Sequence, residues 1–519
     1  VVQVYYSAPQ GKLGKPVKEL VAYAKTDKLA PKESQTLSIE FNVNDMTSYD
    51  DSGATGHKSC YVLEAGDYVI YVGNSVRNVK DVLTYKLDEL KVVEELSEVM
   101  CPNDDNLTIL RPGNKKADGT FEKEYVPSQK PTVDMANRIE ENLPKSMPIT
   151  GDKGITLQDV HEGKNSLDDF VAQLTVEEMA QIIRGEGMSN PRVTQGTASA
   201  FGGISDALFN YGIPAACTAD GPSGLRYDGK AVQLPIGTAL SASWNDKLVR
   251  ELYTMEGEEL RRNEVDTLLG PGVNIHRHPL NGRNFEYYSE DPYLSGTMAV
   301  ASTGGIKDGG AWGTIKHFAL NGQESHRFKI DAVCSERAIR EIYLKTFEMA
   351  VKEKTVMTLM TSYNPINGHW AASNYDLCTT ILRGEWGYEG LVMTDWWAKM
   401  NDVVDGGEES NQDTRDMVRA QNDVYMVVNN NGAEVNSNSD NTESSVEEGK
   451  LTIGELQRAT KNICNFILNA PVIERELVDT DVAKYYPAVP ETEAKYEKFL
   501  LAKDNKVMFN GGKEATLVV

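Results

Sequence analysis

The sequence predicts a multidomain chain in which a TIM-type, (β/α)8-like barrel is joined to an antiparallel β-sandwich. Two patterns of residues predict this combination. In the middle of the chain, short apolar runs that end in polar residues alternate with helical stretches, which is typical of a parallel barrel. In residues 1–90, β-rich runs follow one another, separated by Pro and Gly, which is typical of a sandwich.

The predicted barrel strands end in residues that can do chemistry. Five apolar runs are assigned to strands: 215–220, 267–277, 311–317, 356–364 and 390–395. A helix is predicted over 335–351, where apolar residues recur every three or four positions. Because the strands of a parallel barrel present their C-terminal ends at one mouth, the polar residues at these ends are expected to form a single site.

The run at 390–395 carries the most information. It ends in Asp395, and Trp396 and Trp397 follow at once. A carboxylate that a buried strand delivers next to aromatic rings suits a nucleophile facing a sugar. The alternative for an isolated strand is an Asp that only caps the next helix. The other polar strand ends favour the nucleophile.

Long motifs carry a resemblance to a known family. In order along about residues 174–468 they are LTVEEMAQII, TADGPSGLR, GVNIHRHPLNGRNFEYYSEDP, IKHF, MTSYNPING and LVMTDWW. At these residues the chain resembles glycoside hydrolase family 3, the β-glucosidase and β-xylosidase group. The resemblance implies that Asp395 is the nucleophile, that Trp396 lines the subsite beside it and that Tyr363 contacts the nucleophile. The residues implied to grip the hydroxyls of the non-reducing sugar are Asp220, Arg283, Lys316 and His317.

Simple electrostatics agrees with these roles. A nucleophilic carboxylate must be ionised, so the cations Lys316 and Arg283 are expected to keep the pKa of Asp395 low, while Tyr363 orients it. Charged side chains are also efficient partners for neighbouring sugar hydroxyls. Two alternatives stay open. Arg283 can be tied to a Glu of its own loop, and His317 can be a buried core imidazole.

Residues 1–92 resemble the fibronectin type III-like domain that many family members carry. The predicted strands include the alternating segment 35–44, and a hairpin is predicted at 64–67. Here the domain precedes the barrel, whereas the common order places it last, so the domain order is permuted. Residue 1 already reads as a mid-domain strand, so the first strands of the sandwich are expected to be missing at its N-terminal edge.

The acid/base is not evident in this chain. Retaining hydrolysis needs a second carboxyl about 5 Å from the nucleophile. The resemblance implies that this Glu comes from a separate α/β sandwich domain, which no stretch here matches. We therefore expect an upstream α/β segment or chain to supply it. Glu324 is the in-chain candidate, although it can equally be paired with the neighbouring Arg327. The loop lacks the HGD pattern of the β-N-acetylglucosaminidase branch.

The predicted domain boundaries follow from composition. The sandwich spans 1–92, a Pro- and Gly-rich connector of loops and short helices spans 93–165, the barrel spans 166–470, and a tail that opens a further β element spans 471–519. The polar tract 429–448 is expected to be a solvated, mobile loop at the mouth.

Net charge limits the classes of partner. A formal charge of −24 and a pI near 4.8 argue against nucleic acid and anionic membranes, but a neutral sugar is indifferent to that field. Six cysteines lack metal-type spacing, so no metal or other cofactor is predicted, and reduced thiols favour the cytoplasm. Secretion is the alternative, and assembly into a homo-oligomer is left open.

The expected function is that of an exo-acting retaining β-glycosidase. We expect a β-glucosidase that removes terminal non-reducing β-D-glucosyl residues from β-linked glucosides or short oligosaccharides through a glycosyl-Asp395 intermediate. The alternatives are a β-xylosidase or β-N-acetylglucosaminidase of the same family, and a non-catalytic carbohydrate-binding barrel. Motifs do not fix the sugar, because a single hydroxyl or methylene is read by the shape of the pocket.

Overall fold

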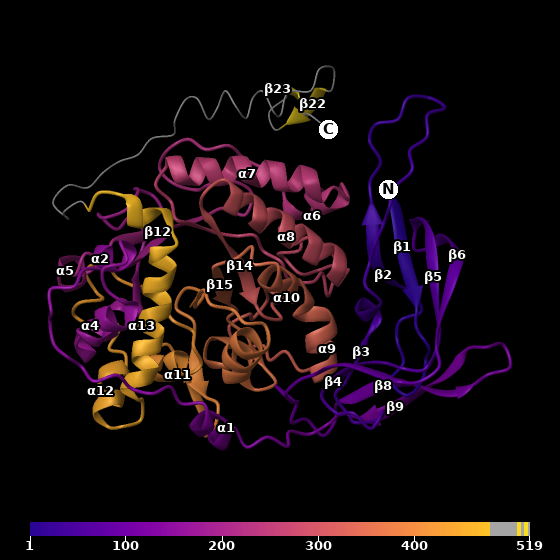
Figure 1. Cartoon of the computed structure of the whole chain (residues 1–519), viewed down its shortest axis with the longest axis horizontal. Helices are drawn as coiled ribbons and strands as arrows, with labels where there is room; N and C mark the ends of the chain where they lie inside the picture. Colours follow the sequence, from indigo (N-terminus) through magenta and orange to yellow (C-terminus); the bar gives the residue numbers. More distant parts are fainter. Residues whose placement is uncertain (478–505, 510–512, 517–519) are drawn as a thin grey trace.

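The computed structural model describes residues 1–477, 506–509 and 513–516. Figure 1 shows two parts side by side, a barrel surrounded by helices and a β-sandwich formed by the first part of the chain. The barrel contains most of the residues singled out above. The two parts therefore correspond to the predicted multidomain architecture.

Eight strands form the barrel sheet. They are β10 (Arg184–Glu186), β11 (Ser199–Gly202), β12 (Ala215–Asp220), β13 (Thr267–Leu269), β14 (Trp312–Phe318), β15 (Thr358–Thr361), β18 (Leu391–Met393) and β21 (Tyr425–Val428). Their order is β18-β15-β14-β13-β12-β11-β10-β21. A parallel bridge between Met393 and Val424 brings the two edge strands together. The predicted barrel is confirmed, with a single departure from a regular one: β11 runs antiparallel to both neighbours.

The predicted strands differ most from the observed ones in the run 267–277. The regular strand stops at Leu269, just before Gly270 and Pro271, because proline has no N–H to donate to a neighbouring strand. Beyond the proline, pairing with β14 resumes as a parallel bridge between Gly272 and Lys316. The prediction missed β10 and β11, which are only three and four residues long and buried along their whole length. Such short strands show neither alternation nor an apolar run long enough to detect.

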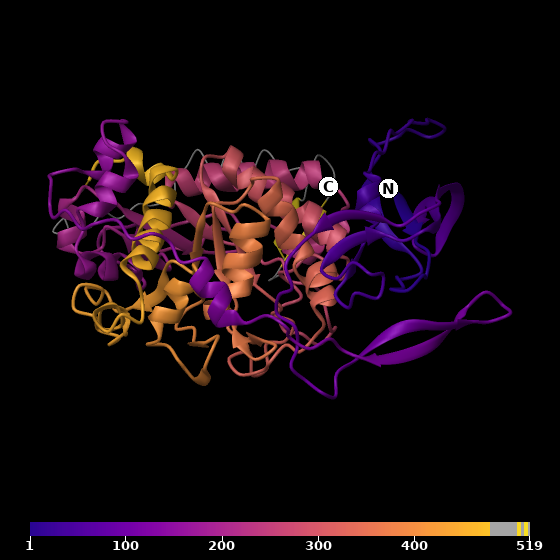
Figure 2. The same ribbon diagram turned by 60° about the horizontal axis from the view of Figure 1, so that its bottom comes forward.

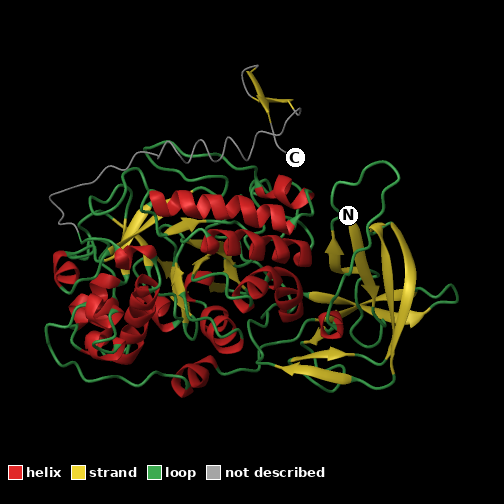
Figure 3. Ribbon diagram, turned by 45° about the horizontal axis from the view of Figure 1, so that its top comes forward, coloured by secondary structure: helices red, strands yellow, loops and turns green. Residues whose placement is uncertain are grey.

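Helices cover the outside of the sheet (Figure 3). The helical elements around the barrel are α4 (Val176–Ile182), α5 (Asp206–Asn210), α6 (Gly237–Ala242), α7 (Asp246–Arg262), α8 (Pro292–Asp308), α9 (Glu336–Ala338), α10 (Lys345–Lys352), α11 (Thr414–Arg419), α12 (Thr442–Glu447) and α13 (Ile453–Leu468). The helix predicted over 335–351 is observed as α9, a π-helical segment η2 (Ile339–Tyr343) and α10. A second π-helical segment is η4 (Asp376–Glu385). Short 3-10 turns are η3 (Ala371–Ser373) and η5 (Pro471–Glu474).

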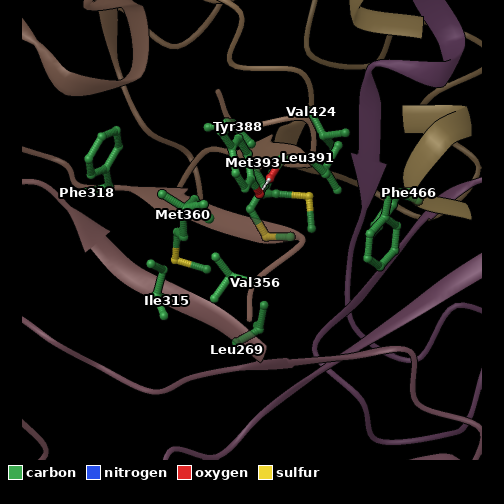
Figure 4. Close-up of a cluster of buried hydrophobic side chains, with 14 of the residues drawn as sticks. Leu269, Ile315, Phe318, Val356, Met360, Tyr388, Leu391, Met393, Val424 and Phe466 are labelled. Atoms are coloured by element: carbon green, nitrogen blue, oxygen red, sulfur yellow. Dashed lines mark hydrogen bonds between the residues drawn. The ribbon is translucent and has the colours of Figure 1, made fainter. Parts of the chain in front are cut away.

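Apolar side chains from the strands fill the space between them. Figure 4 shows Leu269, Ile315, Met360 and Met393 gathered together, and all four are buried. Burial of a side chain of this size contributes about 1.5–3 kcal/mol. Three threonine hydroxyls, those of Thr267, Thr314 and Thr358, lie 2.9–3.0 Å from one another and satisfy each other's hydrogen bonds in this core.

Two buried carboxylates sit at the N-terminal ends of the strands. Asp423 precedes β21 and accepts hydrogen bonds from the Val392 N–H at 2.9 Å and from Arg383 at 2.7 Å. Asp266 precedes β13 and pairs with Arg475, which follows η5. Burial raises the pKa of both carboxyls, and the arginines oppose that rise. These pairs occupy the end of the barrel opposite its mouth, which leaves the C-terminal ends of the strands for the site.

A buried ion pair anchors the segment that follows β21. Arg184 of β10 is 1% exposed, and its guanidinium lies 2.6 Å from Asp440 and 3.0 Å from Glu443. It also donates to the carbonyl of Ala433 at 2.9 Å. The tract 429–448, which was expected to be a solvated, mobile loop, contains α12 and contributes both carboxylates of this ion pair. Its polar composition reflects partners for a buried arginine as well as contact with solvent.

Seven strands form the sandwich: β1 (Val2–Ser7), β2 (Glu19–Ala24), β3 (Ser48–Asp50), β4 (Cys60–Leu63), β5 (Gly66–Ser75), β6 (Asn78–Leu87) and β7 (Lys91–Glu95). One sheet has the order β2-β1-β5-β6 and the other β3-β4-β7. The predicted hairpin at 64–67 is wrong, because this turn leads from β4 in one sheet to β5 in the other. The 3-10 turn η1 (Val43–Met46) precedes β3. The strand predicted at 35–44 forms no ladder in the described part of the chain.

The connector is more structured than predicted. Besides the helices α1 (Met135–Glu141), α2 (Leu157–His161) and α3 (Leu167–Ala172), it contains an antiparallel hairpin of β8 (Thr108–Lys115) and β9 (Phe121–Pro127). This hairpin was not predicted, and it projects away from the body of the molecule in Figure 2. Smaller hairpins in the barrel pair β16 (Pro365–Ile366) with β17 (His369–Trp370) and β19 (Met400–Asp402) with β20 (Gly406–Ser410).

Polar contacts join the sandwich to the barrel. Glu341 of η2 accepts hydrogen bonds from the Tyr49 N–H at 2.6 Å and from Arg337 at 2.9 Å, and it lies 3.5 Å from Lys15. Tyr23 of β2 hydrogen-bonds Thr297 of α8 at 2.8 Å. Because charged groups of both parts satisfy each other, the sandwich is held against the side of the barrel.

The tail is described only in part. β22 (Lys506–Phe509) pairs with β23 (Lys513–Thr516). Most of the predicted tail, residues 478–505, 510–512 and 517–519, lies outside the described residues. All six cysteines lie within the described ranges as free thiols, and Cys217 and Cys464 are among the buried ones. Within these ranges the helices are too short or too polar to traverse a lipid bilayer.

We predict that Asp440→Ala destabilises the barrel by about 3–5 kcal/mol, because it leaves the Arg184 guanidinium buried without its closest carboxylate. Asp168→Ala is the matched control, since it removes a carboxylate that is 63% exposed and paired with Lys461; it should cost under about 1 kcal/mol. Urea unfolding followed by tryptophan fluorescence measures both. Equal losses in the two variants would contradict a structural role for the buried pair.

Candidate active site

The strand ends of the barrel bring the predicted residues together. Asp220 is the last residue of β12, Lys316 and His317 lie near the end of β14, Tyr363 follows β15 by two residues, and Asp395 follows β18 by two. These strands run parallel. Side chains that lie far apart in sequence therefore reach the same mouth.

Asp395 is the centre of this group. It is 8% exposed, and its Oδ1 accepts a hydrogen bond from the Trp396 N–H at 2.7 Å. Its Oδ2 lies 3.7 Å from Nε2 of His317, and the Tyr363 hydroxyl hydrogen-bonds the carboxylate. The predicted contact of Tyr363 with the candidate nucleophile is therefore present. These partners fix the direction of the carboxylate, as an attacking group requires.

The chain turns sharply after Asp395. Trp396 is half-buried beside the carboxylate, whereas Trp397 adopts a left-handed backbone conformation with φ of 56° and is 58% exposed. The Trp397 N–H donates to the Met426 carbonyl of β21 at 2.6 Å. The two tryptophans therefore lie in different environments: Trp396 packs partly buried against the core, and Trp397 is at the surface.

The expected low pKa of Asp395 is wrong. Burial raises the pKa above its ordinary value, and the Trp396 N–H, Lys316, Tyr363 and Arg283 offset only part of that rise. The sequence identified the stabilising partners, but the depth of burial cannot be read from residue types. In a low-dielectric site, desolvation of the charged form outweighs these contacts.

Asp220 lies in an ion-paired cluster at the mouth. Its Oδ1 is 3.3 Å from Nζ of Lys316, and its Oδ2 is 2.8 Å from Nη1 of Arg226. Burial would raise the pKa of Asp220, but Lys316 first and then Arg226 lower it below its ordinary value. Asp220 is thus an ionised acceptor that still has 37% of its side chain exposed, which suits hydrogen bonds to hydroxyl groups.

Arg226 is a site residue that the sequence prediction omitted. It lies in the turn after β12, within the motif TADGPSGLR that carried part of the family resemblance. The signal was therefore present in a quoted motif. The side chain is 74% exposed, so it is placed to meet a ligand that enters the mouth.

His317 is both a buried imidazole and a neighbour of Asp395. Burial first, and then the nearby Arg283, Lys316 and Arg327, lower its pKa well below its ordinary value, so the ring is neutral. Its Nδ1 lies 3.2 Å from the hydroxyl of Tyr287. The two open interpretations of His317 are therefore compatible, because a buried ring faces the site with its other nitrogen.

A second layer of side chains holds His317. Asn321 donates to the Tyr287 hydroxyl at 3.0 Å and to Oε1 of Glu324 at 3.1 Å. The sequence prediction did not include Tyr287 or Asn321. Tyr287 lies within the quoted motif GVNIHRHPLNGRNFEYYSEDP, whereas Asn321 lies just beyond IKHF, outside the quoted motifs. Together they connect the loop that contains Glu324 to the imidazole next to Asp395.

Arg283 is tied to carboxylates, as the alternative interpretation allowed. Its guanidinium forms an ion pair with Glu286 in its own loop and lies 3.8 Å from Glu324. It still contributes positive charge to the site, since it affects the pKa of both Asp395 and His317. A ligand would meet an arginine whose position is already set.

Glu324 is heavily paired. Arg327 donates to its Oε2 at 2.9 Å, in addition to the contacts with Asn321 and Arg283. Its oxygens are occupied by these partners, whereas a general acid has to be free to reach the leaving oxygen. Arg327 also lies 4.7 Å from the ring centre of Tyr363. These contacts suit a residue that orders the mouth better than one that protonates a leaving group.

Among the residues that the structure describes, no group of three or more His, Cys, Asp or Glu side chains is arranged to hold a metal ion. The described mouth instead offers a buried carboxylate, an ionised carboxylate bridged to two cations, a neutral imidazole and an indole. Such a set can hold a polyhydroxylated ring next to a nucleophile.

Comparisons with known proteins agree with this geometry. A family model described as "Glycosyl hydrolase family 3 N terminal domain" matches residues 150–466, and one described as "Fibronectin type III-like domain" matches residues 1–76. A β-glucosidase of Ruminococcus albus is 48% identical over 494 residues, 95% of this chain and 51% of that protein. β-Glucosidase A of Butyrivibrio fibrisolvens is 40% identical over 426 residues, 76% and 49% of the respective chains.

A solved structure gives the same answer. The crystal structure of a β-glucosidase from Paenibacillus barengoltzii aligns with a TM-score of 0.90 at 61% identity, over 92% of this chain and 52% of that one. The chain thus spans about half the length of the relatives it matches. Because the first family model covers more than half of its residues, the chain belongs to glycoside hydrolase family 3.

Proposed function

We propose that this chain is the nucleophile-bearing part of an exo-acting retaining β-glucosidase, which releases terminal non-reducing β-D-glucosyl residues. The observation that carries the proposal is the setting of Asp395, a buried carboxylate at the end of β18 that the Trp396 N–H and Tyr363 orient. The names of the relatives from Ruminococcus, Butyrivibrio and Paenibacillus support glucose as the sugar.

The mechanism follows from the chemistry of the mouth. An oxygen of Asp395 attacks the anomeric carbon, the glycosidic bond breaks, and the departing oxygen takes a proton from a general acid. Water then attacks the glycosyl-Asp395 ester, gives up a proton to the same group and releases the sugar. Asp220 accepts and Lys316 donates hydrogen bonds to ring hydroxyls, and Trp396 packs beside the ring.

The acid/base belongs to polypeptide outside this chain in our proposal. The ion pairs of Glu324 with Arg327 and Arg283 support this assignment, as does the length of the relatives, about twice that of this chain. We propose an upstream α/β segment or chain that brings a Glu close to Asp395. The same ion pairs favour one alternative function, a barrel that binds sugar without hydrolysing it.

An activated substrate separates the two functions. With 2,4-dinitrophenyl β-D-glucoside, whose leaving group needs little protonation, the chain should release the phenol and accumulate a glycosyl-enzyme that intact-mass analysis detects. Asp395→Ala should lose several orders of magnitude in rate, whereas Asp405→Ala, at an exposed carboxylate in the loop after β19, should not. Retention of more than about a tenth of the rate, under about 1.4 kcal/mol of barrier, would refute Asp395 as nucleophile. Absence of phenol release by the unaltered chain would favour the binding barrel.

Loss of the hydroxyl-binding pair should weaken recognition. We expect Asp220→Ala and Lys316→Ala each to reduce kcat/KM for the aryl glucoside by an amount equivalent to about 1–3 kcal/mol, because sugar hydroxyls would lose their partners in a site shielded from water. Lys329→Ala removes an exposed cation near the mouth and should leave kcat/KM unchanged. If both site variants match the unaltered chain, the assignment of this pair is wrong.

Removal of the positive charge of Lys316 should also move the pH profile. Lys316 lowers the pKa of Asp395, and Asp395 must be ionised to attack, so Lys316→Gln should shift the acid limb of kcat/KM towards higher pH. Lys316→Arg keeps the charge and should shift it less. The profile for the aryl glucoside measures the effect, and an acid limb that moves towards lower pH in Lys316→Gln would contradict the electrostatic role.

A further inference from the structure

A chain of hydrogen bonds connects the loop after β14 to the imidazole of His317. Asn321 donates to Oε1 of Glu324 at 3.1 Å and to the hydroxyl of Tyr287 at 3.0 Å. That hydroxyl lies 3.2 Å from Nδ1 of His317. Asn321 is 5% exposed, His317 2% and Tyr287 0%. Because so little solvent reaches these three side chains, they depend on one another for hydrogen bonds.

The direction of each hydrogen bond follows from what the groups can donate. Asn321 turns its amide nitrogen, which can only donate, towards Oε1 of Glu324, and the same nitrogen reaches the Tyr287 hydroxyl. This hydroxyl has one hydrogen, and burial raises the pKa of Tyr287, so the hydrogen stays on the oxygen. Within the described ranges, Nδ1 of His317 is the acceptor in reach of that hydrogen. The Tyr287 hydroxyl therefore accepts from Asn321 and donates to His317.

The ring proton of His317 can be placed from these contacts. The ring is neutral, because burial and three neighbouring cations lower its pKa. A neutral imidazole has one N–H and one acceptor nitrogen. Since Nδ1 accepts from Tyr287, the proton is on Nε2. The other tautomer would turn an N–H towards the phenol and leave the phenol hydrogen buried without an acceptor, which is unfavourable.

We propose that Tyr287 is a positioning residue, whose hydroxyl fixes the tautomer and the direction of His317 so that Nε2–H faces the mouth beside Asp395. Nε2 lies 3.7 Å from Oδ2 of Asp395, which is longer than a hydrogen bond. This N–H is therefore left for an oxygen of a ligand next to the carboxylate. In the opposite tautomer, Nε2 would present a lone pair there and could not donate to a sugar hydroxyl. The value of this arrangement for catalysis rests on the hydrolysis proposed above.

The backbone of His317 is held separately from its ring. Asn274 accepts the backbone N–H of His317 and donates to its carbonyl, each at 2.8 Å. Loss of the Tyr287 hydroxyl therefore acts on the ring and leaves the backbone anchored. The neighbouring Tyr288 supplies a matched control, because it is also buried but its hydroxyl bonds Ser302 instead.

Nitrogen NMR of the histidine rings tests the proposal without a substrate. The chain has seven histidines, and His317→Gln identifies the signals of His317 by their loss. In the unaltered chain we expect a neutral ring with its proton on Nε2 from about pH 6 to 8. Tyr287→Phe should move the Nδ1 resonance towards that of an acceptor without a hydrogen bond, whereas Tyr288→Phe should not. A proton on Nδ1 in the unaltered chain, or an unmoved Nδ1 resonance in Tyr287→Phe, would overturn the proposal.

Kinetics test the role of Tyr287 in the reaction. With 2,4-dinitrophenyl β-D-glucoside, Tyr287→Phe should lower kcat/KM about fivefold, the effect of one hydrogen bond, and Tyr288→Phe should leave it unchanged. Equal kcat/KM in the two variants would overturn the positioning role. If the unaltered chain releases no phenol while the NMR results are as expected, the proposed hydrolysis fails and the assignment of the tautomer to Tyr287 holds. If Tyr287→Phe does not fold, the tautomer in the unaltered chain decides.

Discussion

Closure of the eight-stranded sheet is the constraint on which the site depends. The residues at the mouth come from β12, β14, β15 and β18, and they meet only if the strands curl round until β18 and β21 lie side by side. The bridge between Met393 and Val424 makes that closure. β21 in turn pairs with β10, where the buried Arg184 holds the following segment through Asp440. The position of Asp395 is therefore linked to an ion pair on the other side of the barrel.

Two carboxylates near one cation have pKa values that shift in opposite directions, because the carboxylates differ in exposure. Lys316 lowers the pKa of both Asp220 and Asp395. Asp220 keeps 37% of its side chain in contact with solvent, and its pKa falls below the ordinary value; Asp395 keeps 12%, and its pKa rises. The pair illustrates the competition between desolvation and ion pairing. It also explains how the proposed hydroxyl-binding carboxylate and the proposed nucleophile can share a single lysine.

The sequence predicted the positions of several barrel strands and the convergence of their polar ends. The strands that end in Asp220 and near His317 are close to the predicted ranges, and the polar strand ends converge as the pattern of a parallel barrel requires. The misses have physical reasons. β10 and β11 are too short to show an alternation of apolar and polar residues. The antiparallel direction of β11 has no counterpart in the local sequence pattern. The pKa of Asp395 depends on burial, which is a property of the whole fold. Segment 35–44 has the alternation of a strand, but a ladder also needs a partner.

The contact between Arg475 and Asp266 limits where the chain can be truncated without loss of a buried ion pair. The family model ends at residue 466, and composition places the end of the barrel at 470. The chain nevertheless continues through η5 and returns Arg475 to the carboxylate beneath β13, where Asp266 also accepts the N–H of Cys217 at 2.8 Å. A shortened chain that stops at either boundary would leave a carboxylate with 0% of its side chain exposed without its cation. A barrel that keeps this ion pair therefore includes residue 475, several residues past the end of α13.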